Sequence, residues 1–178
     1  MRDPFPTPSG AAALALVAGA TLLARSQLAH GVLAAVVAGF DLVVHEAGHP
    51  IFGLLGSRFL MFLGGALGQL TPPLVAALVF LRRRQPGAFA AMVVWIGVNL
   101  VDIGTYAADG EARLLPLLAV DADSHDWWNM LGMLGLRHQA PAIGRVIQAV
   151  GWTVQAAGPL WLLTRWMWRW VGEVGEAE

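Results

Sequence analysis

Long apolar segments separated by short polar stretches dominate the hydrophobic pattern of this chain. Most of them approach or exceed the roughly 20 apolar residues that an α-helix needs to cross a hydrocarbon core about 30 Å thick. The pattern therefore predicts an all-α fold, a polytopic membrane helix bundle of about five spans. The expected spans are residues 10–24, 32–55, 59–81, 88–108 and 142–163.

Two places depart from this simple pattern. Pro72 and Pro73 lie inside the third segment and favour a broken or re-entrant helix, because proline lacks the backbone donor and crowds the preceding turn. The polar loop 109–140 is the second place. Its sequence DADSHDWW predicts a helix cap at Asp123 or Ser124, followed by a short interfacial helix whose tryptophans lie among the lipid headgroups.

The composition also favours a membrane protein. Hydrophobic residues make up 57% of the chain and charged residues only 13%, against about 25% charged residues in soluble domains. Cysteine is absent, which excludes disulfides and thiolate ligands, and a net charge of -1 gives no electrostatic basis for binding nucleic acid. We expect a single membrane-embedded domain over residues 1–178, with a polar N-terminal tail 1–9 and an acidic C-terminal tail 171–178.

The second predicted span contains the sequence HEAGH, which has the spacing of a zinc site. On a helix His45 and His49 share one face, so both imidazoles can bind one ion at about 2.0–2.1 Å. Glu46 lies beside them, where it can act as a catalytic base toward water. Asp41, four residues before His45, is expected to orient the second ring nitrogen of that histidine. Alternatively, the histidines are interfacial and Glu46 pairs with Arg58.

Two further spans carry residues that are candidates for lining the same site. The fourth span has a polar stripe close to one helical face, formed by Asn99, Asp102, Tyr106 and Asp109. Such a stripe should face the bundle interior or a wet cavity, and hydrogen bonding between helices is the alternative to a catalytic role. The third span contains Gly64, Gly65, Gly68 and Gln69, for which we favour close helix packing over a part in a substrate cleft.

A catalytic zinc site needs a third protein ligand and one open position. The candidates are His125, Asp126, Asp102 and Asp109. We rank the His125–Asp126 pair first, because imidazole and carboxylate both suit zinc and the pair lies at the expected start of the short helix. Adjacent helical residues point about 100° apart, so one of the two is expected to bind and the other to orient it or contact substrate. A solvated histidine and a capping aspartate are the alternative.

The HEAGH motif inside an apolar segment resembles the site-2 protease class of intramembrane zinc metalloproteases. Over residues 41–135 the chain is also similar to small bacterial integral membrane proteins that share HEAGH, a following FLGG…Q segment, the pattern DIGTYAADGEARLLPL and an HDW motif. The resemblance implies bound Zn2+, a multi-pass protein of the bacterial inner membrane, and metalloprotease activity. The third-ligand motif departs from the protease pattern, because NLVD at residues 99–102 lacks the proline and the Asp-Gly pair.

Three functions are compatible with these residues. The first is a membrane-embedded zinc-dependent hydrolase, a peptidase of membrane or membrane-proximal polypeptides, with the lipid bilayer as its surroundings. The second uses the same site on a lipid or on a small amide or ester. The third is a metal-binding or scaffold membrane protein without turnover. Glu46 separates the classes, because hydrolysis requires a base beside the water whereas metal storage does not.

The distribution of arginine predicts the orientation of the chain. Arginines at 82–84 and at 165 and 169 end the third and fifth spans, and short cytoplasmic loops carry an excess of such residues. Reporter fusions after Arg84 and after Arg169 should therefore report the cytoplasm, and a fusion after Val120 the outer side. The opposite pattern of reporter activity would reverse the topology.

Overall fold

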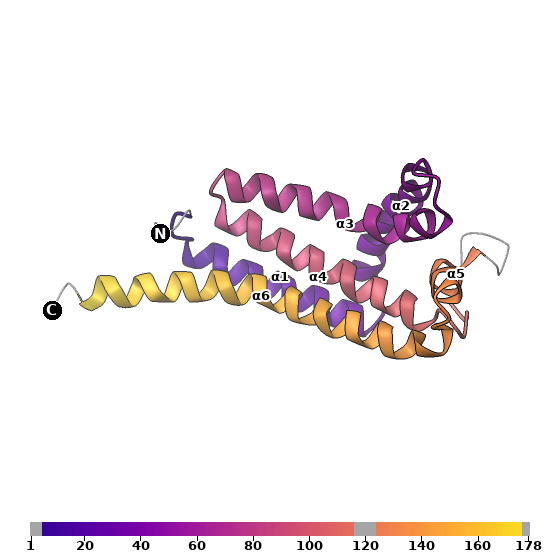
Figure 1. Ribbon diagram of the computed structural model, residues 1–178. Coiled ribbons are helices and arrows are strands. Elements are labelled where there is room, and N and C mark those ends of the chain that lie inside the picture. The colour runs from indigo at the N-terminus through magenta and orange to yellow at the C-terminus, as the bar shows by residue number, and fades with distance from the viewer. Residues whose placement is uncertain (1–4, 116–123, 176–178) are drawn as a thin grey trace. The chain divides into compact units, whose positions relative to one another are not determined.

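The computed structural model describes residues 5–115 and 124–175, with side chains as far as residue 168 (Figure 1). Within these ranges the regular structure is helical and contains no strand, which confirms the predicted all-α class. The elements are α1 (Gly10–Leu28), α2 (Val32–Gly53), α3 (Arg58–Arg82), α4 (Pro86–Ala108), α5 (Asp126–Met133), η2 (Arg137–Gln139) and α6 (Ala140–Gly175).

Five helical segments are long and apolar enough to cross a membrane, as the sequence predicts. They are Gly10–Leu28, Val32–Gly53, Arg58–Arg82, Pro86–Ala108 and Arg137–Trp168. Many large apolar side chains on these helices are exposed, including Phe40 and Val43 of α2. Lipid tails are the solvent in which such a surface is stable, because exposing it to water is unfavourable. The pattern is that of an integral membrane protein.

The third span is one continuous helix, so the break predicted at Pro72 and Pro73 is wrong. The proline ring fixes φ close to the helical value, and membrane helices tolerate proline where neighbouring groups satisfy the carbonyls that it leaves without a donor. A side-chain hydrogen bond lies in the same turn, where the hydroxyl of Thr71 donates to the carbonyl of Leu67 at 2.7 Å. Two prolines are therefore accommodated without ending α3.

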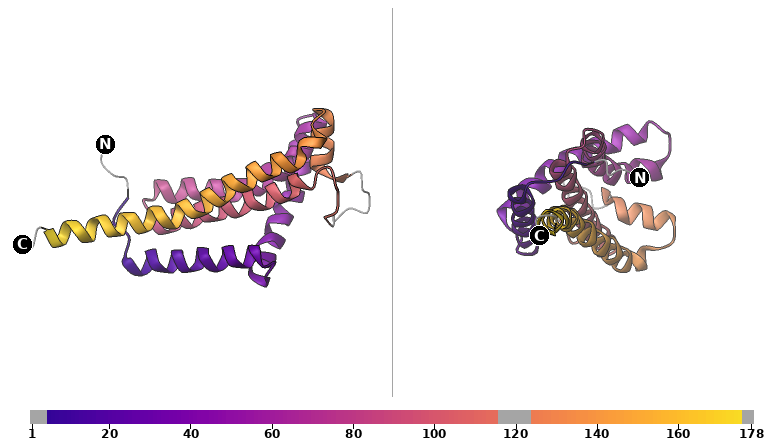
Figure 2. Two further views of the ribbon diagram at one scale, coloured as in Figure 1. Left: turned by 90° about the horizontal axis from the view of Figure 1, so that it is seen from below. Right: turned by 90° about the vertical axis from the view of Figure 1, so that its left-hand side faces the viewer.

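Helices also continue beyond the apolar segments that predicted them. The helix α1 ends at Leu28 rather than at residue 24, and α6 runs to Gly175 rather than to residue 163 (Figure 2). Arginine and glutamine at these ends are good helix formers, so backbone hydrogen bonding extends past the apolar stretch. The predicted acidic tail thus begins inside α6, and residues 176–178 lie outside the described residues.

The short helix predicted in the polar loop is present as α5, but its cap is a different residue. His125 is the N-cap, and its Nδ1 accepts a hydrogen bond from the backbone N–H of Trp128 at 3.3 Å. The predicted cap at Ser124 is therefore wrong, and Asp123 lies outside the described residues. A neutral imidazole nitrogen can take the acceptor role that serine or aspartate normally fills at this position.

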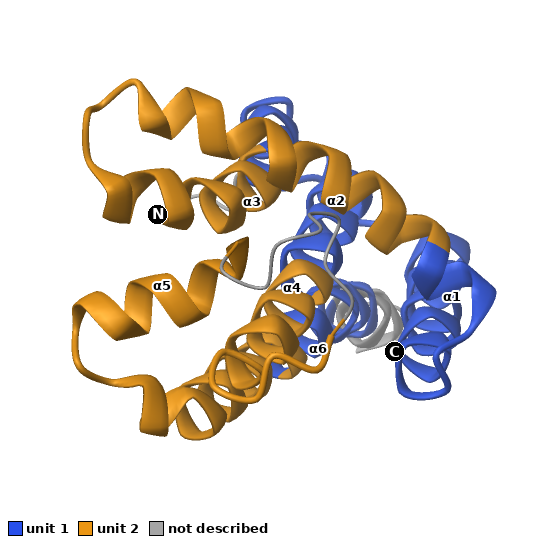
Figure 3. Cartoon of the chain, turned by 90° about the vertical axis from the view of Figure 1, so that its right-hand side faces the viewer, with its two compact units in different colours: residues 1–35, 72–97, 153–178 blue, residues 36–71, 98–152 orange. Residues whose placement is uncertain are grey.

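The chain divides into two compact units (Figure 3). Unit 1 comprises residues 1–35, 72–97 and 153–178, and unit 2 comprises residues 36–71 and 98–152. The core of unit 1 is formed by Ala13, Ala90 and Leu162, with Trp161 and other partly buried side chains packed against it. All residues of the candidate site described below belong to unit 2.

Glycines allow α2 and α3 to approach closely within unit 2. A Cβ atom at Gly48 would collide with the carbonyl oxygen of Gly64, and one at Gly68 would lie 2.8 Å from the carbonyl oxygen of Val44. Small residues at such crossings are typical of membrane helices, where packing rather than water exclusion drives association. The packing role predicted for Gly64 and Gly68 is confirmed, and the crossing places the HEAGH turn directly against α3.

Candidate functional site

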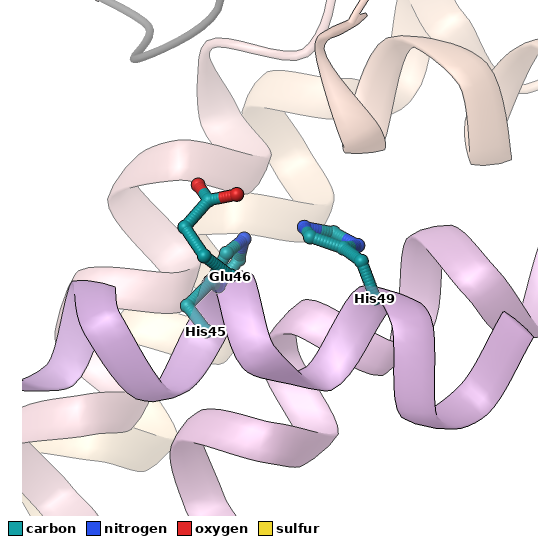
Figure 4. Close-up of side chains that lie close together, drawn as sticks. All are labelled: His45, Glu46 and His49. Atoms are coloured by element: carbon teal, nitrogen blue, oxygen red, sulfur yellow. The ribbon is translucent and has the colours of Figure 1, made fainter.

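The helix α2 presents the three residues of the HEAGH motif on neighbouring turns (Figure 4). One ligand atom each from His45, Glu46 and His49 lies within 4.8 Å of the other two, so the group could hold a metal ion. His45 is buried, His49 is partly buried and Glu46 is exposed. The described part of the chain shows no ion pair between Glu46 and Arg58, which leaves the carboxylate free to face the site.

Hydrogen bonds on the Nδ1 atoms direct both imidazoles toward a common point. His49 Nδ1 lies 2.9 Å from the carbonyl oxygen of Met61, and His45 Nδ1 lies 3.3 Å from Oε1 of Gln69. Both partners are acceptors, so each Nδ1 donates, and the Nε2 of a neutral ring then offers its lone pair to a metal ion. Nε2 of His45 is also within hydrogen-bond distance of Oδ2 of Asp126, a contact that requires a proton or a metal ion between the two atoms. Acceptors on the second ring nitrogen are the usual support of metal-binding histidines.

The carboxylate of Asp126 lies opposite both histidines. Its Oδ2 is 3.0 Å from His45 Nε2 and 3.5 Å from His49 Nε2, and the residue is only 5% exposed. Two ligand atoms at about 2.0–2.1 Å from a tetrahedral ion are roughly 3.3–3.4 Å apart. The observed separations lie within a few tenths of an ångström of that value. Asp126 is therefore a candidate for a third ligand beside the two histidines.

Two residues of α3 that sequence reasoning assigned to packing support His45 directly. Gln69 is 3% exposed and holds Nδ1 of His45, which is the role predicted for Asp41. The orienting role of Asp41 stays a prediction, and the hydrogen bond to Nδ1 comes from the neighbouring helix α3. At Gly65 a Cβ atom would collide with the imidazole of His45, so glycine makes the space for the ring. Gln69 lies close to the glycines of α3, and this position of a polar residue is the sequence feature that could have indicated its contact with His45.

The polar stripe of α4 contributes to the site from two positions. Asp102 accepts a hydrogen bond from Nε2 of Gln69 at 2.9 Å, and the hydroxyl of Tyr106 accepts one from the backbone N–H of Asp126 at 3.1 Å. Asn99 is fully buried and is not among the residues that line the cavity. Asp109 accepts hydrogen bonds from the backbone N–H groups of two residues that follow α4. Asp102 and Tyr106 of the stripe therefore contact residues of the site.

Of the pair predicted from the short helix, Asp126 faces the histidines and His125 faces away. The ring of His125 stacks on Tyr106 at 4.2 Å, and its Nε2 is 3.4 Å from Asp109, an electrostatic contact without good hydrogen-bond geometry. Burial lowers the pKa of His125, although the carboxylate of Asp109 opposes this shift. A neutral ring agrees with the acceptor role of its Nδ1 at the start of α5. His125 is thus placed to orient Asp126.

A cavity of about 690 Å³ opens beside these groups. It is the size of a pocket for a small molecule or for a few residues of a polypeptide. The polar residues that line it are His45, Glu46, His49, Gln69, Asp102, Tyr106, Ser124 and Asp126. The apolar ones are Ala38, Leu42, Met61, Phe62, Ile103 and Leu115. An apolar cavity with a few converging polar groups is the usual form of a binding or catalytic site.

Comparison of the chain with protein-family models, with curated proteins and with solved structures gives no match.

The geometry predicts one bound transition-metal ion per chain and distinguishes the two candidates for third ligand. Asp126→Ala should lose the ion during purification without chelator, as should His45→Ala and His49→Ala, because each removes a converging atom. His125→Asn should retain at least half of it, since asparagine can still cap α5. Metal content per chain, measured by mass spectrometry, checks both. Retention by Asp126→Ala together with loss by His125→Asn would reverse the assignment.

Proposed function

We propose that this protein is a membrane-embedded, zinc-dependent hydrolase that cleaves peptide bonds of membrane or membrane-proximal polypeptides. The observation that carries the proposal is the convergence of His45 Nε2, His49 Nε2 and Asp126 Oδ2, with Glu46 beside them in the same cavity. Two imidazoles and one carboxylate form a set that zinc accepts in catalytic sites, with one position left open. The resemblance of HEAGH to intramembrane metalloproteases supports the same reaction and a bacterial inner-membrane location.

Each group of the chain has a defined task in this proposal. When bound, zinc would supply a Lewis acid that polarises a carbonyl group and acidifies water. Glu46 takes the proton of the attacking water and passes it to the leaving nitrogen. The hydrogen bonds of Met61 and Gln69 keep the imidazoles in the tautomer that presents Nε2. The apolar walls of the cavity limit bulk water and leave room for an apolar chain.

The charge of the cavity favours an uncharged substrate. Three carboxylates line it, those of Glu46, Asp102 and Asp126, and no arginine is found among its described lining residues. The nearby Arg113 and Arg137 lie over the ring of Trp128, at 4.1 and 3.6 Å from its centroid. A phosphate or carboxylate held away from the metal would lack a cationic partner, and burying an unpaired charge is costly. This supports an internal peptide bond over a phospholipid.

Replacing the base should separate metal binding from hydrolysis. Glu46→Gln should keep the zinc content of the wild type and abolish turnover, because the amide cannot accept a proton from water. Membranes of cells that produce either protein are analysed for new polypeptide termini by mass spectrometry. The termini should appear with the wild type and be absent with Glu46→Gln. The same termini in both samples would contradict the hydrolase proposal.

The preference for an uncharged substrate can be measured with metal-binding probes of matched length. Octanohydroxamic acid should bind the cobalt-loaded protein at least tenfold more tightly than suberic acid monohydroxamate, which ends in a carboxylate. The two probes can also differ in how much of each dissolves in the detergent micelle. Substitution of Leu115, which lines the cavity and is 38% exposed, controls for this difference because it changes the cavity and not the detergent. Leu115→Lys should lower the ratio of the two affinities at least tenfold, whereas Leu115→Met should leave it unchanged. Equal ratios for both variants would contradict the electrostatic argument.

A further inference from the structure

A row of three side chains connects α4 through α3 to the metal-facing histidine of α2. Asp102 accepts a hydrogen bond from Nε2 of Gln69 at 2.9 Å, and Oε1 of the same amide lies 3.3 Å from Nδ1 of His45. Gln69 is 3% exposed and His45 is 7% exposed, so water cannot readily replace either partner. The three groups are all within unit 2.

The orientation of the amide follows from its carboxylate partner. The NH2 group of Gln69 faces α4 and donates to Oδ2 of Asp102, an oxygen that accepts in this contact. The carbonyl oxygen of the amide then faces His45. Because this oxygen only accepts, Nδ1 of His45 must donate, and the lone pair of the ring is left on Nε2. The opposite rotamer would place two donors against Nδ1 and would favour the wrong tautomer.

We propose that Asp102 and Gln69 are positioning residues that set the tautomer of His45 and thereby the metal affinity of the site. The inference rests on the proposed function, since it concerns the same metal site. It differs from the common arrangement in which a carboxylate contacts the metal-binding histidine directly. Here a neutral amide separates Asp102 from Nδ1, so this nitrogen is oriented without a carboxylate directly against it.

The proposal predicts that the effect of Gln69→Glu on metal affinity depends on the residue at position 102. Gln69→Glu in the wild-type background sets the new carboxylate against that of Asp102, and two anions in contact cannot both stay ionised at this distance. We expect metal affinity to fall 10- to 100-fold, as losses of supporting groups commonly cause. In the Asp102→Asn background the new carboxylate can accept from the asparagine amide and from Nδ1. There the same substitution should keep affinity within threefold of the wild type or raise it.

The experiment compares four proteins in one detergent: wild type, Gln69→Glu, Asp102→Asn and the double variant. Zinc affinity is measured by competition with a chromogenic chelator, and nitrogen NMR of histidine-labelled, metal-loaded protein reports which ring nitrogen carries the proton. Gln148→Glu is the matched control, because Gln148 also donates to a residue of α4, Thr105, at 3.0 Å but does not line the cavity. Gln148→Glu should change zinc affinity less than threefold, both in the wild type and in the Asp102→Asn background.

The outcomes separate this inference from the proposed function. Rescue of Gln69→Glu by Asp102→Asn, with Nδ1 protonated in the wild type and in the double variant, supports the positioning role. Equal losses from Gln69→Glu in both backgrounds, with zinc still bound by the wild type, would overturn the inference and leave the metal site intact. A wild type that binds no zinc would instead overturn the proposed function. A comparable loss of zinc affinity in Gln148→Glu would show that the effect comes from helix packing in general, and it would overturn the inference.

Discussion

The contact of one carboxylate with two imidazoles is the interaction on which the candidate site depends. Asp126 lies 3.0 Å from His45 and 3.5 Å from His49, and these groups sit among apolar helices where ionisable side chains are costly. A carboxylate oxygen and an imidazole nitrogen so close together need a cation between them, either a proton or a metal ion. Each of the three residues is held by a neighbouring hydrogen-bond partner: Gln69 for His45, the carbonyl of Met61 for His49, and Tyr106 for Asp126.

Backbone packing brings these groups together. Glycine at position 48 lets α2 meet α3 at the turn between the two histidines, and glycine at position 65 leaves the volume that the ring of His45 fills. Met61 and Gln69 then reach the Nδ1 atoms from α3. Larger residues at the crossing would separate the helices and remove both acceptors. The orientation of the two histidines therefore depends on the close packing of α2 against α3.

The short helix α5 is held by contacts that keep its first residue facing α2. Tyr106 accepts a hydrogen bond from the backbone N–H of Asp126, and His125 caps the helix while stacking on that tyrosine. Farther along, the guanidinium groups of Arg113 and Arg137 both lie over the ring of Trp128. Cation–π contacts of this kind help to hold an aromatic side chain in place. The third candidate ligand is thus placed by contacts that are distant in sequence from the HEAGH motif.

The sequence by itself determined the helices and the pair of histidines, because both depend on local spacing. Apolar length predicts the spans, and an interval of four residues puts His45 and His49 on one face. Local spacing could rank Asp126 as a ligand but could not choose it over His125, and it did not identify Gln69 as a partner of His45. Those choices depend on which neighbouring helix reaches each nitrogen. Only the tertiary structure decides them, because the glycine crossing sets how α2 meets α3 and the contacts of Tyr106 and His125 set which residue of α5 faces α2.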